Sequence, residues 1–264
     1  MMPAEIRKVT IIGSGNVAWH LGKRIFEKGF EITQLFGRNE STLKEMACEL
    51  RAEMTTDAAA VRKDADAYII SVSDDAIKKV AGRLDFGKSI VIHTAGSLGL
   101  DVFERLAVNY GVLYPLQTFT KSSNIAFNDV PLFIEANKPD VLSVIRNFAD
   151  KLSPEVHEVG SERRMKLHLA AVFACNFTNH MYALAEKLMK EDGIPFGLLL
   201  PLMRETLDKA TSLSPHDAQT GPAMRNSKSI IDLHLKMLEK DPAMREIYET
   251  VSRSISATAK PKWK

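Results

Sequence analysis

A glycine-rich turn between an apolar run and an amphipathic run constrains the fold of this chain more than any other segment. The stretch VTIIGSGNVAWHLGKRI places Gly13, Gly15 and Ala18 at the spacing G-x-G-x-x-A. The first glycine permits a tight turn, the second lets the backbone approach a phosphate, and the small third residue lets a helix pack closely on the preceding strand. Because a strand precedes the pattern and a helix follows it, the pattern predicts a dinucleotide site on a βαβ unit.

The first turn of this predicted helix supplies the phosphate site. Unpaired N–H groups and a partial positive charge at a helix N-terminus favour anions. We therefore assign cofactor binding to Gly13, Ser14, Gly15, Asn16 and Val17. The structural alternative is a glycine turn that binds no ligand.

The first 160 residues alternate β-branched runs with amphipathic stretches, which is typical of βαβ units. The predicted strands are Val9–Gly13, Glu31–Phe36, Ala67–Val72, Ser89–His93, Val112–Tyr114 and Pro131–Glu135. The predicted helices are Val17–Lys28, Ser41–Leu50, Asp75–Leu84, Leu100–Val108 and Pro139–Leu152. This pattern predicts an α/β domain, residues 1–160, with a doubly wound, parallel, Rossmann-type sheet.

The strand signal disappears after Gly160. Helical patterns follow, separated by Gly, Pro and Ser, over Glu162–Asp192, Phe196–Ser212, Ser227–Glu239 and Pro242–Thr258. We predict an all-helical domain over residues 161–264 that serves substrate binding and dimerisation. The basic ending, Lys260 to Lys264, is expected to be a frayed, solvated tail.

Composition excludes several classes of protein. Hydrophobic residues make up 45% and charged residues 26%, which is typical of a globular chain. Because Lys plus Arg number 35 and Asp plus Glu 33, we expect no nucleic-acid or membrane partner. The two cysteines form no CxxC pair, so we expect no metal site, and no apolar run is long enough to span a membrane. We expect a cytoplasmic protein with a small-molecule substrate.

The end of the second predicted strand distinguishes NADP(H) from NAD(H). An NAD site carries an acidic residue here to bind the ribose 2′-hydroxyl. This chain instead has Gly37, Arg38 and Asn39, followed by Ser41. Arginine pairs well with a phosphate, so we predict NADP(H) as the cofactor, bound in part by Gly37, Arg38 and Asn39. The alternative is that Arg38 is an ordinary surface arginine.

Ligands of such sheets lie beyond the carboxyl ends of the strands. At these ends we assign cofactor binding to Ser71, Val72, Ser73 and Ala95, and substrate binding to Gly96, Ser97 and Gln117. For Ser73 and Asp74 a helix cap is the competing interpretation. For His93 a structural role at a strand end competes with a chemical one.

A polar stripe marks the first long helix after residue 160. At about 100° per residue, one helix face carries His168, Cys175, Asn176 and Asn179. Polar groups in a buried helix are costly unless satisfied, so this stripe either faces a ligand cleft or builds an internal hydrogen-bond network. We predict catalytic roles for His168, Asn176 and Asn179, together with Tyr114 at the end of a predicted strand.

A loop before a later helix carries one cation among small residues. Arg225, in the segment TGPAMRNS, could bind an anionic group of the substrate with the help of the helix N-terminus. The alternative is a helix start capped by Ser227, with Arg225 on the surface.

Several motifs together carry a resemblance to a known family. These are GSGNVA, GRN, SVSDD, HTAGS, YPLQTF, LHLAAVFACNF and TGPAMR. Over nearly the whole chain the sequence resembles the Rossmann-like NADP oxidoreductases with a C-terminal helical domain of unassigned function. These proteins are related to pyrroline-5-carboxylate reductases and to 6-phosphogluconate and β-hydroxyacid dehydrogenases. The resemblance implies a helical dimerisation domain, an active site in the cleft between the domains, and a loop at Arg225 that reaches the neighbouring subunit.

The chain departs from its relatives at two places. β-Hydroxyacid dehydrogenases carry a catalytic lysine and an asparagine one helical turn apart, whereas Lys166 is followed four residues later by Ala170. Many members of the wider family place His-Pro after a late strand, where this chain has Tyr114 and Pro115.

The sequence therefore predicts an NADP(H)-dependent oxidoreductase. It would transfer hydride between the nicotinamide and a small carbonyl or imine compound, in a homodimer formed through the helical domain. The alternative is an NADPH-binding sensor without turnover.

Overall fold

The chain divides into two compact units, which are described separately. A computed structural model describes residues 2–123 and 125–258 of the 264. The first unit is Met1–Asn176 and the second is Phe177–Lys264. The predicted tail over Lys260 to Lys264 lies outside the described residues.

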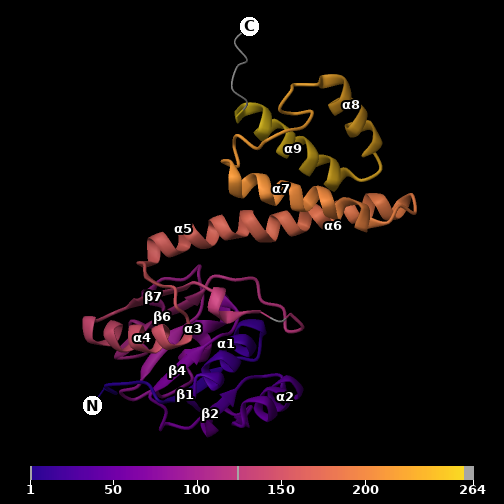
Figure 1. Ribbon diagram of the computed structural model, residues 1–264. Coiled ribbons are helices and arrows are strands. Elements are labelled where there is room, and N and C mark those ends of the chain that lie inside the picture. The colour runs from indigo at the N-terminus through magenta and orange to yellow at the C-terminus, as the bar shows by residue number, and fades with distance from the viewer. Residues whose placement is uncertain (1, 124, 259–264) are drawn as a thin grey trace. The chain divides into compact units, whose positions relative to one another are not determined.

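The first unit is built on one eight-stranded sheet in the order β3-β2-β1-β4-β5-β6-β7-β8 (Figure 1). Neighbouring strands are parallel except for the pair β6 and β7. The strands are β1 (Lys8–Ile12), β2 (Glu31–Phe36), β3 (Glu53–Thr55), β4 (Ala67–Ile70), β5 (Ile90–His93), β6 (Asn109–Pro115), β7 (Leu132–Ala136) and β8 (Val156–Glu158). This architecture confirms the Rossmann-type fold class.

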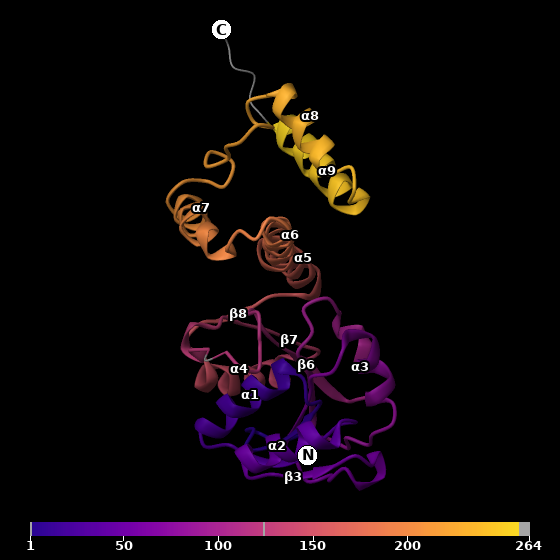
Figure 2. The same ribbon diagram turned by 90° about the vertical axis from the view of Figure 1, so that its right-hand side faces the viewer.

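Helices cover both faces of the sheet, and Figure 2 shows α3 on the side opposite α1 and α4. One buried cluster joins the sheet to α1 (Asn16–Glu27), α2 (Glu40–Leu50) and α4 (Pro139–Leu152). A second cluster joins the other face to α3 (Asp74–Ala81) and the 3-10 helix Leu100–Phe103. Since both faces are covered, the central strands β1, β4, β5 and β6 are mostly apolar and nearly fully buried, as parallel strands are expected to be.

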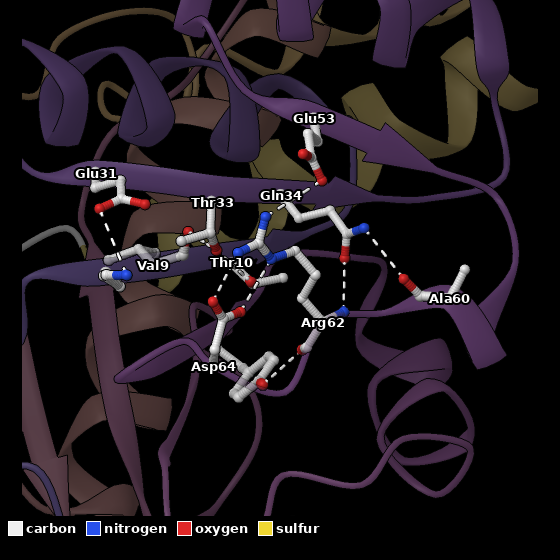
Figure 3. A network of polar contacts seen from close by, with 11 residues as sticks. Val9, Thr10, Glu31, Thr33, Gln34, Glu53, Ala60, Arg62 and Asp64 are labelled. Atoms are coloured by element: carbon white, nitrogen blue, oxygen red, sulfur yellow. Dashed lines mark hydrogen bonds and ion pairs between the residues drawn. The ribbon is translucent and has the colours of Figure 1, made fainter.

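A polar network fixes the segment between β3 and β4 (Figure 3). The Gln34 amide donates to the Ala60 carbonyl at 3.1 Å and accepts from the Arg62 N–H at 2.9 Å. The Arg62 guanidinium pairs with Asp64 at 2.7 Å, while the Tyr68 hydroxyl donates to the Arg62 carbonyl at 2.7 Å. The connection is therefore held by side chains of β2 and β4.

The structure corrects four details of the predicted α/β pattern. The three-residue strands β3 and β8 were missed, because strands this short show no alternation. The sheet is mixed, since β7 runs antiparallel to β6. The predicted helix Leu100–Val108 is only the 3-10 helix Leu100–Phe103, which ends before the start of β6.

The helix after residue 160 is interrupted. It consists of α5 (Ser161–Ala171), a π-helical segment (Val172–Phe177) and α6 (Thr178–Glu191). The first compact unit ends within the π-helical segment, so it includes α5, whereas the predicted boundary lay at residue 160. A π-helix pairs residues i and i+5, so the angle per residue falls below the 100° assumed for the polar stripe.

The second unit is helical, as predicted. After α6 it contains the 3-10 helix Phe196–Leu199, α7 (Leu200–Ser212), α8 (Lys228–Met237) and α9 (Pro242–Thr258). Helices α8 and α9 lie side by side (Figure 2). His234 Nδ1 on α8 is 2.8 Å from the Tyr248 hydroxyl on α9. Within the described part of the chain, every helix is too short or too polar to cross a bilayer.

Candidate functional site

The glycine turn after β1 has the geometry of a phosphate cradle. Gly13 has φ of +124°, a region that disfavours side chains, and a Cβ there would lie 2.0 Å from the Ser71 carbonyl oxygen. Its N–H donates to the Phe36 carbonyl at 2.7 Å. A Cβ on Gly15 would meet nothing within 4 Å, so the backbone there is open to a ligand.

The first turn of α1 follows directly. Gly15 is its N-cap and makes no side-chain cap, so the helix presents N–H groups that a phosphate can accept from. Ser14 and Val17 are half-buried beside the exposed Gly15. The Asn16 amide donates to the Phe119 carbonyl at 2.9 Å, which leaves its backbone N–H for the predicted cofactor contact.

The end of β2 has the features expected for binding a 2′-phosphate. Arg38 is exposed and forms no side-chain hydrogen bond or ion pair with any described residue. Asn39 caps α2, because its side-chain oxygen accepts from the Thr42 N–H at 3.1 Å, and its NH₂ group stays available as a donor. Gly37 is half-buried and Ser41 is exposed in the first turn of α2. These groups fit the adenosine phosphate of NADP(H).

The loops after β4 and β5 meet beside the cradle. The Thr94 hydroxyl donates to Ser71 Oγ at 3.2 Å, and both residues are buried. Ser73 is the N-cap of α3 but makes no side-chain cap, and Val72 is half-buried. The Ser97 hydroxyl donates to the Asp74 carboxylate, which ties the two loops together. Ala95, in the loop after β5, is also buried.

Two residues from distant parts of the sequence meet beyond the end of β6. The Tyr114 hydroxyl lies 3.0 Å from His168 Nδ1, and their rings are edge-on with centroids 5.9 Å apart. Tyr114 comes from β6 and His168 from α5. Both belong to the first compact unit. We call this pair the Tyr114–His168 dyad.

Gly96 makes this contact possible. A Cβ on Gly96 would lie 2.7 Å from Tyr114 Cζ and 2.8 Å from His168 Nδ1. These distances are shorter than the van der Waals contact of a carbon with either atom. Any residue larger than glycine at position 96 would therefore push the two rings of the dyad apart. Gly96 was predicted as a substrate residue, and the structure places it directly against both rings.

The surroundings of Tyr114 keep its phenol protonated. Burial raises the pKa of Tyr114, and the negative charge of Asp74 raises it further. Arg164 opposes this shift of the Tyr114 pKa, and Cys175 adds a smaller rise. A neutral phenol beside an imidazole is able to donate a proton at neutral pH.

His93 has the environment of a structural histidine. Its side chain is fully buried, and Nδ1 accepts from the Ala95 N–H at 3.2 Å. Burial and the charge of Arg164 lower the pKa of His93 to about 4, while Gly99 and Glu135 oppose them. The Gly99 contact is weak, because His93 Nε2 has no partner within hydrogen-bonding geometry among the described residues. The structural alternative for His93 is therefore favoured.

The remaining predicted site residues lie on exposed parts of the two units. Asn176 and Cys175 are exposed in the π-helical segment, where the assumed 100° spacing fails. Asn179 and Arg225 are exposed in the second unit, and Ser227 is the N-cap of α8 without a side-chain cap. Gln117 is exposed and accepts from the Thr118 N–H at 2.8 Å. The predicted interdomain cleft and the roles of these residues stay predictions.

Sequence reasoning missed the ionic groups around the dyad. Asp74 was considered at a strand end, with a helix cap as the alternative, but not as a charge acting on Tyr114. Arg164 and Glu135 gave no signal, because their pairing depends on the packing of α5 against β7. The described residues contain no group of three or more His, Cys, Asp or Glu placed to hold a metal ion.

Comparisons with known proteins agree with this fold. A family model described as "NADP oxidoreductase coenzyme F420-dependent" matches residues 8–96, and a "Domain of unknown function (DUF2520)" matches residues 130–255. A solved protein of Bacteroides fragilis, described as a "putative NADP oxidoreductase", is 42% identical, with a TM-score of 0.89. The match covers 97% of this chain and 100% of that one.

Two more distant structures share the fold. One is 1-pyrroline-5-carboxylate reductase of Streptococcus pyogenes, which is 15% identical with a TM-score of 0.60, over 97% of this chain and 100% of its own. The other is the reductive aminase of Aspergillus terreus in complex with NADPH and ethyl-5-oxohexanoate, which is 14% identical with a TM-score of 0.65, over 96% of this chain and 92% of its own. No match was found among proteins of curated function.

The sheet and its glycine turn define a Rossmann-type nucleotide-binding protein with an appended helical unit. At 42% identity over almost the whole length, the chain belongs to the NADP oxidoreductase family of the Bacteroides fragilis protein.

Proposed function

We propose that this chain is an NADPH-dependent reductase of small carbonyl or imine compounds, with the Tyr114–His168 dyad as its proton donor. The observation that carries the proposal is the 3.0 Å contact between Tyr114 and His168 Nδ1, at the sheet edge where the cradle also lies. The distant relatives named as pyrroline-5-carboxylate reductase and reductive aminase support C=N or C=O compounds as the substrate class.

The cofactor site would be formed by the first unit alone. Gly13 and Gly15 leave room for the pyrophosphate at the start of α1, and Arg38 would pair with the 2′-phosphate. Ser71, Val72, Ser73 and Ala95 would border the nicotinamide half, because they follow β4 and β5, the next two strands of the sheet after β1. The bound cofactor supplies the hydride.

The dyad would supply the proton. The Tyr114 hydroxyl donates to the oxygen or nitrogen of the substrate as the carbon gains hydride, and His168 Nδ1–H then stabilises the phenolate. The proton returns to Tyr114 through the imidazole from solvent. Gly96, Ser97, Gln117 and Arg225 stay the proposed substrate contacts, while Asn176 and Asn179 stay proposed catalytic residues.

A substrate panel tests the reductase against the sensor. NADPH consumption would be measured with small ketones, cyclic imines and an oxidised deazaflavin, the last because of the F420 description of the N-terminal match. Under the proposal, the wild-type protein oxidises NADPH when at least one carbonyl or imine compound of the panel is present as substrate. The variants His168→Asn and Asn176→Ala should bind NADPH normally but turn over at least tenfold more slowly. Tight NADPH binding with no turnover of any compound favours the sensor.

The cofactor preference has its own test. Arg38→Ala removes the proposed partner of the 2′-phosphate, which is worth about 1.4 kcal/mol or more for a charge-assisted pair. NADPH affinity should fall about tenfold, with NADH affinity unchanged, in fluorescence titrations. Equal affinity changes for the two cofactors contradict the assignment.

The second unit would mediate homodimerisation. Many of its large apolar side chains are exposed, including Leu198, Leu202, Leu207, Leu233 and Met237. Extended apolar surfaces of this kind mark interfaces. Sedimentation should show a dimer, and the double substitution Leu202→Lys with Leu207→Lys should make it monomeric; a wild-type monomer at micromolar concentration rules the dimer out.

A further inference from the structure

Arg164 is a charged residue in an unusual position. It is the largest fully buried side chain among the described residues, although its guanidinium carries a full positive charge. It lies in the first turn of α5. Burying a charge costs several kcal/mol unless it is paired and hydrogen-bonded. Its position therefore requires specific partners.

The partners of Arg164 come from two other parts of the first unit. Its guanidinium pairs with the Glu135 carboxylate on β7 and donates to the Leu98 carbonyl at 2.5 Å. Ser161 completes the cluster, because its N–H and hydroxyl donate to Glu135 at 2.9 and 2.7 Å. The Leu100 N–H donates to Ser161 Oγ at 3.2 Å. This Arg164–Glu135–Ser161 cluster joins α5, β7 and the loop after β5.

Arg164, Glu135 and Leu98 each lie two to four residues from a residue that forms or supports the dyad, or from its partner in the sheet. On α5, Arg164 precedes His168 by four residues, which places the two on one helix face about 6 Å apart along the axis. On the sheet, Glu135 is paired with Val112, two residues before Tyr114 on the same strand face, which is about 6.6 Å. Leu98 lies two residues after Gly96. The Arg164–Glu135 contact and the His168–Tyr114 contact are therefore separated by a similar distance along α5 and along the sheet.

We propose that Arg164 is a positioning residue for the Tyr114–His168 dyad. By holding α5 to Glu135 and the Leu98 loop, it sets the distance and orientation of His168 relative to Tyr114 and keeps Gly96 beneath both rings. Arg164 touches neither ring through a hydrogen bond, so it acts through the placement of α5. The inference rests on the proposed function for its kinetic consequence and not for its structural one.

The structural readout is the state of His168 in the protein without ligand. Nitrogen NMR of histidine rings, assigned with His168→Asn, should show two distinct ring nitrogens for His168 in wild type, because the bond to Tyr114 fixes one tautomer. Arg164→Met should merge these signals toward the values of a free imidazole. Arg163→Met, at the exposed neighbouring position, is the matched control and should leave them unchanged. Arg164→Lys should recover part of the wild-type pattern.

The kinetic readout separates positioning from general stabilisation. Single-turnover rates should fall about 10- to 100-fold in Arg164→Met, with NADPH affinity within twofold of wild type, because the cradle does not involve α5. In a Tyr114→Phe background, Arg164→Met should slow the reaction no further, since the two changes remove the same contribution. If Arg164→Met does not fold, Glu135→Gln replaces it in both measurements.

The outcomes distinguish this inference from the proposed function. A folded Arg164→Met or Glu135→Gln with wild-type His168 signals and wild-type rate overturns the positioning role. Additive losses in the double variant also overturn it. Altered His168 signals in a protein whose wild type reduces no compound support the positioning role while contradicting the reductase.

Discussion

The two compact units bury apolar side chains to very different extents. In the α/β unit, both faces of the central strands are covered, and residues such as Leu113 and Ile69 are fully buried. In the described part of the helical unit, only Ala223, Leu238 and Met244 among the hydrophobic residues are buried. Met237 is 73% exposed there. The α/β unit closes its own core, whereas the helical unit leaves most of its large apolar side chains exposed.

This contrast separates two tasks. The cradle, the dyad and the Arg164–Glu135–Ser161 cluster all lie in the unit with the closed core. Reactive groups need supports that hold them within a fraction of an ångström, and a dense core provides such support. The exposed leucines of the helical unit are the reason for the proposed homodimer.

The largest expected effect tests the contrast in packing directly. Leu113→Ala removes a fully buried side chain and should lower the free energy of unfolding by about 3 kcal/mol, independent of protein concentration. Urea unfolding followed by the fluorescence of buried Trp19 measures it in the α/β unit. The matched change Leu233→Ala, 52% exposed on α8, should cost less than about 0.5 kcal/mol at dilute, monomeric concentration. Equal losses at both positions would break the comparison.

Acid should weaken the α/β unit through His93. Its pKa is about 4 in the folded chain against 6.5 for a free histidine, so between these values the unfolded chain binds more protons. Stability from the neutral His93 is complete above pH 6.5 and is lost as pH falls toward 4, by roughly 3 kcal/mol at most. Urea titrations should show a shallower loss in His93→Gln. The same slope in variant and wild type would show that His93 is not held neutral.

A smaller change separates the dyad without disturbing the cradle. Gly96→Ala places a Cβ less than 3 Å from Tyr114 and His168, so the rings must move apart. The rate of hydride transfer should fall about 100-fold, which is at the low end of the rate loss expected when a general acid is removed. NADPH affinity should stay within twofold of wild type. Stopped-flow oxidation of bound NADPH measures the first quantity and fluorescence titration the second. A rate within threefold of wild type contradicts the proton-donor role of the dyad.

The smallest effect compares one open glycine from each unit. A Cβ on Gly15 or on Gly197 would meet nothing within 4 Å, so alanine should change stability by less than about 0.5 kcal/mol at either site. Gly15→Ala should nevertheless weaken NADPH binding about tenfold, because the methyl group fills the approach of the pyrophosphate. Gly197→Ala should leave the affinity unchanged. Weaker binding in both variants would place part of the cofactor site in the helical unit.

Local signals predicted much of this molecule. The glycine turn and the helix over Pro139–Leu152 were predictable, because turn chemistry and apolar periodicity depend on neighbouring residues. The antiparallel direction of β7 was not, since alternation says nothing about strand direction. The π-helical segment was also missed, because apolar periodicity does not distinguish a π-helical turn from an α-helical one.

The site was predicted residue by residue but not as an arrangement. Tyr114 and His168 were both proposed as catalytic, yet their contact joins β6 to α5 across 54 positions. The roles of Arg164 and Glu135 were not predicted, because the sequence does not show whether an arginine and a glutamate form a buried or an exposed ion pair. Long-range packing, rather than residue type, decides such features.

The most direct test of the account is a single-turnover measurement on Tyr114→Phe with NADPH bound and the best compound from the substrate panel. The α/β unit should bind NADPH as in wild type, while hydride transfer slows at least 100-fold and loses the pH dependence contributed by the phenol. Wild-type transfer in Tyr114→Phe would contradict the claim that the Tyr114–His168 dyad is the proton donor.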